Sequence, residues 1–257
     1  MLPMTACELH HTFAGPAGAG VVVLSNSLGT TLEMWEPQAA VLARDRRVLR
    51  YDMRGHGRSP VPETPYAIAD LGADLVGLLD RNGIERASLC GVSLGGMVSM
   101  WVAAHAPERV DRLVLCSTSA IMGPPGSWTE RAALVRREGT AAVADTVVAR
   151  WFTPGFAASR PDVVAAIRAQ LAATPPEGYA GCCEAIKDMD QRPDLPSVTA
   201  PTLVIAAEAD PSTPPAHART IAGLIPGARL EVLDRGAHLV NVEEPGLVTP
   251  LITAHLG

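Results

Sequence analysis

Short hydrophobic runs rich in β-branched residues recur along the chain and alternate with longer stretches of mixed polarity. Apolar residues repeat at helical spacing between Ile68 and Leu79, and a second helix is expected from Leu94 to near His105. The alternation predicts an α/β fold with a mostly parallel sheet that is covered by helices on both faces. The runs that predict buried strands are 20–25, 47–52, 87–92, 112–117, 202–207 and 229–234.

The alternation breaks between residues 121 and 190, where apolar residues recur at helical spacing without a strand-like run. Prolines and glycines mark both edges of this stretch, in GPPG (123–126) and RPDLP (192–196). We therefore expect a helical cap over 121–190, inserted in an α/β core that comprises 1–120 and 191–257.

Composition narrows the function classes. With 257 residues and 47% hydrophobic content, the chain can bury a sizeable core. Its 27 acidic and 21 basic side chains form no block of like charge, which argues against a nucleic-acid partner. The start MLPMTACELHHTF lacks a signal-peptide pattern, and no stretch approaches the roughly 20 apolar residues of a membrane span, so we expect a cytoplasmic protein. The five cysteines, an odd number, favour neither disulfides nor zinc.

The segment from Gly91 to Gly95 reads GVSLG, a GxSxG motif that joins the predicted strand 87–92 to the helix that begins at Leu94. This context is that of a nucleophile elbow, a sharp turn that exposes a serine above the sheet. The turn forces the serine toward positive φ, and the flanking glycines remove side chains that would collide there. Ser93 is therefore predicted to be the nucleophile.

A serine hydroxyl needs a general base, and the base needs an acid that fixes its tautomer. In folds with this elbow the chain order is Ser, acid, His. His238 lies in a loop directly after the strand 229–234, whereas His217 and His255 lie in predicted helices. His238 is therefore the predicted base.

The acid is expected to follow the preceding strand, and Asp210 does so after 202–207. Asp234, which ends its own strand four residues before His238, remains an alternative, as does Glu208 close to its strand end. His56, in DMRGHGRS (52–59), precedes the serine, so a packing and turn role is expected for it.

An oxyanion that forms during acyl transfer needs backbone amide donors. One is expected from Leu94, at the start of the helix after the nucleophile. The other is expected from Leu28 in SNSLGT (25–30), the polar turn after the first strand.

The segments SNSLGT, YDMRGHGRS, CGVSLGGM, PTLVIAAEAD and GAHLVNVEEP together resemble the α/β-hydrolase superfamily across nearly the whole chain. Within it, SNSLGTTLEMW (25–35), CGVSLGGMVSMWVA (90–103), RWFTPGF (150–156) and YAGCCEAIKDMDQR (179–192) resemble the 3-oxoadipate enol-lactonases of aromatic catabolism. The resemblance implies a triad of Ser93, Asp210 and His238. It also implies opening of a small anionic lactone without metal or cofactor.

The acetate arm of such a lactone is anionic, so a donor or cation is expected in its pocket. Trp128 and Arg131 lie three residues apart in SWTERAALV and share one face of a helix, and the resemblance places a similar pair there. Both are candidate substrate-binding residues. In the alternative, Trp128 packs the cap against the core and Arg131 is solvated.

Several functions share the predicted triad. Another carboxylesterase, a carbon–carbon bond hydrolase and a cofactor-free perhydrolase would use the same residues. A dehalogenase or epoxide hydrolase is disfavoured because it needs an aspartate where Ser93 stands. The alternative of a different class is a non-catalytic ligand-binding receptor, because a fold does not by itself imply a function.

Overall fold

The computed structural model describes residues 6–257, which form a seven-stranded sheet in the order β1-β3-β2-β4-β5-β6-β7. The strands β2 to β7 coincide with the six predicted runs, and they pair in parallel throughout. The predicted α/β fold with a mostly parallel sheet is therefore confirmed. These strands are β2 (Val21–Ser25), β3 (Arg47–Tyr51), β4 (Ala87–Val92), β5 (Val110–Cys116), β6 (Thr202–Ala207) and β7 (Arg229–Leu233).

The strand β1 (His11–Ala14) is an addition to the prediction and pairs antiparallel with β3 at the sheet edge. It has only four residues and none of them is fully buried. An edge strand of this kind carries no continuous hydrophobic run, which is the pattern that reveals the inner strands.

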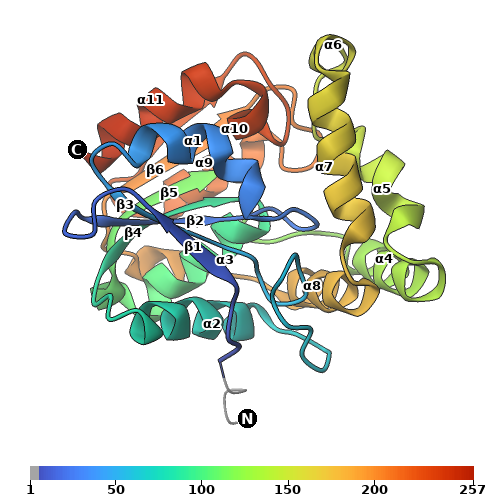
Figure 1. Cartoon of the computed structure of the whole chain (residues 1–257), viewed down its shortest axis with the longest axis horizontal. Helices are drawn as coiled ribbons and strands as arrows, with labels where there is room; N and C mark the ends of the chain where they lie inside the picture. The colour runs from blue at the N-terminus through green and yellow to red at the C-terminus, as the bar shows by residue number, and fades with distance from the viewer. Residues whose placement is uncertain (1–5) are drawn as a thin grey trace.

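Helices cover both faces of the sheet, as predicted. In Figure 1, α1 (Glu36–Leu42) and α11 (Pro245–Leu256) lie on one face, and α2 (Ile68–Arg81) and α3 (Leu94–His105) lie on the other. All six residues of β4 are buried between these layers. α9 (Pro215–Leu224) packs against β6 and β7, and short 3-10 turns occupy Leu32–Trp35, Pro107–Arg109 and Leu195–Ser197.

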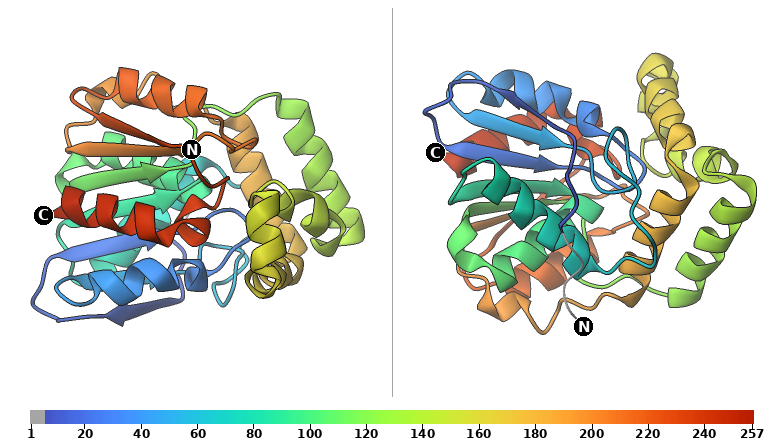
Figure 2. Two further views of the ribbon diagram at one scale, coloured as in Figure 1. Left: turned by 90° about the horizontal axis from the view of Figure 1, so that it is seen from above. Right: turned by 60° about the horizontal axis from the view of Figure 1, so that its bottom comes forward.

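The cap, by which we mean the helices α4 to α8, lies between β5 and β6 in the chain. Figure 2 shows it as a separate layer beside one end of the sheet. Ile121 and Asp190 form an isolated antiparallel bridge that joins its two ends. The division into a core and a cap with limits at 121 and 190 stays a prediction. The cap helices are α4 (Pro125–Glu138), α5 (Ala141–Val148), α6 (Pro154–Ser159), α7 (Pro161–Ala173) and α8 (Pro176–Asp188).

Prolines set the starts of most cap helices. α4, α6, α7 and α8 each begin at a proline. The first helical residue has no intrahelical partner for its N–H, and the φ of proline already suits a helix, so proline is favoured at this position. The prolines that punctuate the sequence therefore mark helix boundaries.

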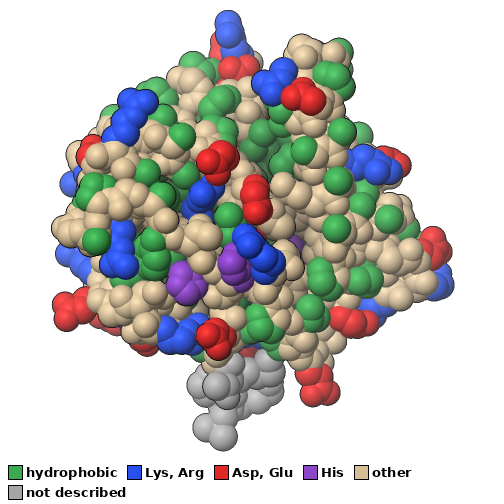
Figure 3. Space-filling view, viewed as in Figure 1, with side chains coloured by type: hydrophobic (Ala, Val, Ile, Leu, Met, Phe, Trp, Pro, Cys, Tyr) green, Lys and Arg blue, Asp and Glu red, His purple; other side chains and the backbone are tan. Residues whose placement is uncertain are grey.

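Two surface properties bear on partners. On the face shown in Figure 3, basic and acidic side chains are intermixed and do not form a patch of one sign. Within residues 6–257, no helix has both the length and the apolar character needed to cross a membrane.

Candidate active site

Ser93 lies in the sharp turn between β4 and α3. Its φ of 55° and ψ of −118° place it in the positive-φ region that the elbow motif predicts. A Cβ on Gly91 would lie 2.2 Å from the carbonyl oxygen of Gly95, and a Cβ on Gly95 would lie 2.1 Å from that of Ser25. Both glycines are therefore required sterically for this turn.

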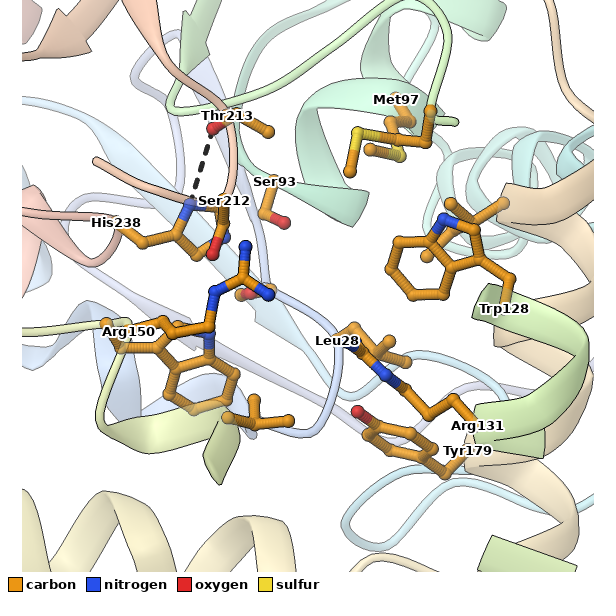
Figure 4. A pocket seen from close by; sticks show the side chains of 15 residues that line it. Leu28, Ser93, Met97, Trp128, Arg131, Arg150, Tyr179, Ser212, Thr213 and His238 are labelled. Atoms are coloured by element: carbon orange, nitrogen blue, oxygen red, sulfur yellow. Dashed lines mark hydrogen bonds between the residues drawn. The ribbon is translucent and has the colours of Figure 1, made fainter. Parts of the chain in front are cut away.

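Hydrogen bonds from two directions hold the backbone of Ser93. Its amide donates to the carbonyl of Cys116 at 3.0 Å. Its own carbonyl accepts from Thr118 Oγ1 at 2.7 Å and from the amide of Met97 at 3.0 Å. The backbone is thus fixed, and the side chain faces a cavity that His238 also lines (Figure 4).

His238 occupies the loop between β7 and α10 (Val240–Glu243), and Asp210 follows β6. The two side chains are buried, and His238 Nδ1 lies 2.9 Å from Asp210 Oδ2. A carboxylate only accepts, so Nδ1 carries the proton and Nε2 has a free lone pair. The structure thus brings Asp210 to the histidine, whereas Asp234 and Glu208 are exposed and form no hydrogen bond with it within residues 6–257.

The Asp210 carboxylate is held by further donors. Oδ1 accepts from the amides of Ser212 at 2.8 Å and Thr213 at 3.0 Å, and Oδ2 accepts from Thr213 Oγ1 at 2.7 Å. Burial alone would raise the pKa of Asp210, but the charge and hydrogen bond of His238, together with Thr213, hold it well below its ordinary value. No sequence motif points to Thr213, although a hydroxyl residue three positions after the acid, within a turn, is a signal for such a hydrogen bond.

The amide of Leu28, in the turn after β2, has no acceptor among the described residues. The amide of Ser27 contacts Met34 Sδ, that of Gly29 donates to His56 Nε2, and that of Thr30 donates to the carbonyl of Ser27. Leu94, the first residue of α3, also has an amide with no partner inside its helix. Both amides have the hydrogen-bonding capacity that an oxyanion hole needs.

His56 has a structural role. His56 is buried, its Nε2 accepts from the amide of Gly29 at 2.9 Å, and its Nδ1 donates to the carbonyl of Arg54 at 3.1 Å. Burial lowers the pKa of His56, which favours the neutral ring that this arrangement requires. Its expected packing and turn role is therefore confirmed. His217 and His255 lie in α9 and α11.

The cavity in front of Ser93 lies between the core and the cap. It encloses about 480 Å³ of space not occupied by protein atoms, part of it open to solvent. The two predicted substrate-binding residues, Trp128 and Arg131, both line it from α4. Tyr179 of α8 and Arg150, to which no sequence motif assigns a role, line it as well (Figure 4).

Arg131 is held in the cavity by an aromatic contact. Its Cζ lies 4.7 Å from the centroid of the Trp128 ring, a cation–π arrangement. Across residues 6–257, no carboxylate forms an ion pair with Arg131. The cavity therefore presents a positive charge that the described chain leaves unneutralised. In that same part of the chain, no three or more histidine, cysteine, aspartate or glutamate side chains are grouped to hold a metal ion.

The chain is similar in sequence and in fold to known proteins. A family model described as alpha/beta hydrolase fold matches residues 20–245. The chain is 42% identical to 3-oxoadipate enol-lactonase 2 of Acinetobacter baylyi over 237 residues, which cover 92% of this chain and 88% of that protein. The structure matches an enol-lactonase from Burkholderia xenovorans LB400 with a TM-score of 0.95 and 44% identity, over 97% of this chain and 96% of that one. A thermophilic esterase from Thermogutta terrifontis with malate bound matches with a TM-score of 0.93 and 29% identity, over 99% and 96%. The chain therefore belongs to the α/β hydrolase fold family.

Proposed function

We propose that this protein is a serine hydrolase that opens 3-oxoadipate enol-lactone to 3-oxoadipate in the catabolism of aromatic compounds. The observation that carries the proposal is a single cavity that combines Ser93 on its elbow, the His238–Asp210 pair and the cation of Arg131. The names of the enol-lactonases from Acinetobacter and Burkholderia support the choice of substrate.

In the first half of the proposed reaction, His238 Nε2 takes the proton of the Ser93 hydroxyl while its oxygen attacks the lactone carbonyl. The amides of Leu28 and Leu94 donate to the oxyanion that forms. Asp210, kept ionised by its low pKa, stabilises the imidazolium and fixes the ring. The tetrahedral intermediate then collapses, the ring C–O bond breaks, and an acyl-enzyme remains on Ser93.

The leaving oxygen of an enol-lactone is an enolate that stays tethered to the acyl chain. It takes the proton from His238 and tautomerises to a ketone, which draws the reaction forward. In the second half, His238 removes a proton from water, and the hydroxide attacks the acyl-enzyme carbonyl. Collapse of the second intermediate returns the proton to Ser93 and releases 3-oxoadipate.

Arg131 supports an anionic substrate. Burying a carboxylate without a partner is costly, and an arginine donates two hydrogen bonds to a carboxylate. Because Arg131 forms no ion pair in the described chain and lies over the Trp128 ring, it is available for the acetate arm of the lactone. Trp128 would then orient the guanidinium rather than only pack the cap.

The substrate is tested by following the loss of ultraviolet absorbance of the enol-lactone, in parallel with neutral aryl esters and other lactones. We expect a clear preference for the enol-lactone and loss of all hydrolysis in Ser93→Ala. Hydrolysis that persists in Ser93→Ala would refute the role of the nucleophile. Equal activity on all substrates would favour a general carboxylesterase, and an inactive wild type would favour the ligand-binding receptor.

The charge role is tested with Arg131→Ala. We expect the KM for the lactone to rise by about tenfold or more, as for a lost hydrogen bond to a charged group, with little change for a neutral ester. The matched control is Arg137→Ala on the same helix, where the arginine is exposed and contacts Glu138. Equal effects of Arg131→Ala on both substrates would reject the charge role.

A further inference from the structure

We propose that Tyr179 is a second substrate-binding residue, whose hydroxyl donates a hydrogen bond to the anionic arm of the substrate beside Arg131. This inference rests on the proposed function, because it names how the same cavity selects a carboxylate. It adds Tyr179, which follows Arg131 by 48 positions in the sequence, from α8, a helix that packs against α4.

The Tyr179 hydroxyl is buried beside the Arg131 guanidinium (Figure 4), which can donate a hydrogen bond but cannot accept one. The residue lines the cavity in front of Ser93, and its hydroxyl proton has no acceptor among the described residues. Leaving a buried hydroxyl donor without an acceptor is unfavourable. The other two tyrosines are satisfied, since Tyr51 bonds Ser25 Oγ at 2.9 Å and Tyr66 donates to the carbonyl of Pro62 at 2.8 Å. Tyr179 is thus the one tyrosine in the described chain whose hydroxyl proton has no acceptor, and a ligand carboxylate would supply that acceptor.

The Tyr179 ring packs close to the turn that carries Leu28. A Cβ on Gly29 would lie 3.2 Å from Cε2 of Tyr179 and 2.9 Å from Cγ of Leu171, so the absence of a side chain at Gly29 lets the ring pack there. The hydroxyl is therefore held close to the expected oxyanion-binding turn. A donor that is fixed before binding loses little entropy when the substrate arrives.

The charge around Tyr179 suits a donor to an anion. Burial raises the pKa of the Tyr179 hydroxyl well above its ordinary value, and the nearby charge of Arg131 opposes this only in part. The hydroxyl therefore stays protonated and can donate throughout the neutral range. Figure 4 shows it beside the Arg131 guanidinium, so two donors face the same part of the cavity. Two adjacent donors match the two oxygens of a carboxylate.

The kinetic test compares Tyr179→Phe with the wild type on the enol-lactone and on a neutral aryl ester. We expect the KM for the lactone to rise about tenfold or more, as for a hydrogen bond to a charged group, while kcat and the KM for the neutral ester change less than about twofold. The control is Tyr66→Phe, which removes a hydroxyl outside the cavity and is expected to leave both KM values unchanged. An equal rise in KM for both substrates would overturn the proposal, because it would indicate a packing role.

A binding test separates this inference from the proposed function. Adipate, a six-carbon dicarboxylate, serves as the probe in calorimetric titrations of the wild type and of Tyr179→Phe. We expect the variant to bind it about tenfold or more weakly and, without ligand, to melt at or above the wild-type temperature, because the phenylalanine removes an unsatisfied polar group. If the wild type does not open the lactone, the proposed function fails, but adipate affinity still tests Tyr179. Equal affinity in both proteins, or no binding to the wild type, would refute the role of Tyr179.

Discussion

Glu243 connects the cap to the loop that carries His238, and its replacement by glutamine tests whether this connection matters. The buried carboxylate accepts from the Thr153 hydroxyl, from the amide of Thr153 at 3.2 Å and from the amide of Ala237 at 3.0 Å. Thr153 lies at the start of α6, and Ala237 immediately precedes His238. One side chain on α10 therefore links the start of α6 to the loop that carries His238.

Glu243→Gln keeps the shape of the side chain but replaces one acceptor oxygen by a donor. With Oε1 retained toward the Thr153 hydroxyl, the new NH₂ faces the amide of Ala237. Losing one hydrogen bond to a charged acceptor costs roughly 1.5–3 kcal/mol. At about 2–4 °C per kcal/mol for a domain of this size, the melting temperature is expected to fall by roughly 3–12 °C.

We also expect lower activity, because the loop that Glu243 holds carries His238. A displacement of about 1 Å in a reacting group can cost on the order of 100-fold in rate. We expect kcat/KM of Glu243→Gln to fall by about tenfold or more at a temperature where the variant is folded. The control is Glu244→Gln, whose half-buried carboxylate makes no hydrogen bond among the described residues. Melting curves and kcat/KM that match this control would refute the reasoning.

Local patterns predict the sheet and the nucleophile. Inner parallel strands are buried on both faces, so they appear as continuous hydrophobic runs, and β4 is the clearest case. The elbow is likewise local, since the geometry of Ser93 depends on Gly91 and Gly95 within the same five residues. β1 lacks such a run because it is short and half exposed, and only its pairing with β3 defines it.

Residues whose roles depend on tertiary contacts are harder to predict. Asp210 and His238 are 28 positions apart, and only the shared edge of β6 and β7 brings them together, so the chain order narrows the choice of acid without deciding it. Arg150 and Tyr179 begin two of the segments that carry the family resemblance, but no motif assigns either of them a role. They reach the cavity only because the cap helices fold over Ser93, which no spacing in the sequence indicates.

Three further predictions concern the triad and the elbow. Asp210→Asn leaves His238 without its anionic partner, and we expect kcat to fall by about 10⁴-fold, measured on the best ester substrate. Gly95→Ala places a Cβ 2.1 Å from the carbonyl of Ser25, so we expect a lower melting temperature and loss of activity, whereas Gly155→Ala, with open space around it, should leave both unchanged. Because the pKa of Asp210 is lower in the folded protein than in the unfolded chain, its ionisation stabilises the fold above about pH 3.9, and this contribution is lost as the pH falls toward the folded pKa. The difference in free energy of unfolding between wild type and Asp210→Asn, measured by urea titration, should therefore shrink from about pH 5 to about pH 3. A difference that stays constant over this range would contradict a lowered pKa for Asp210.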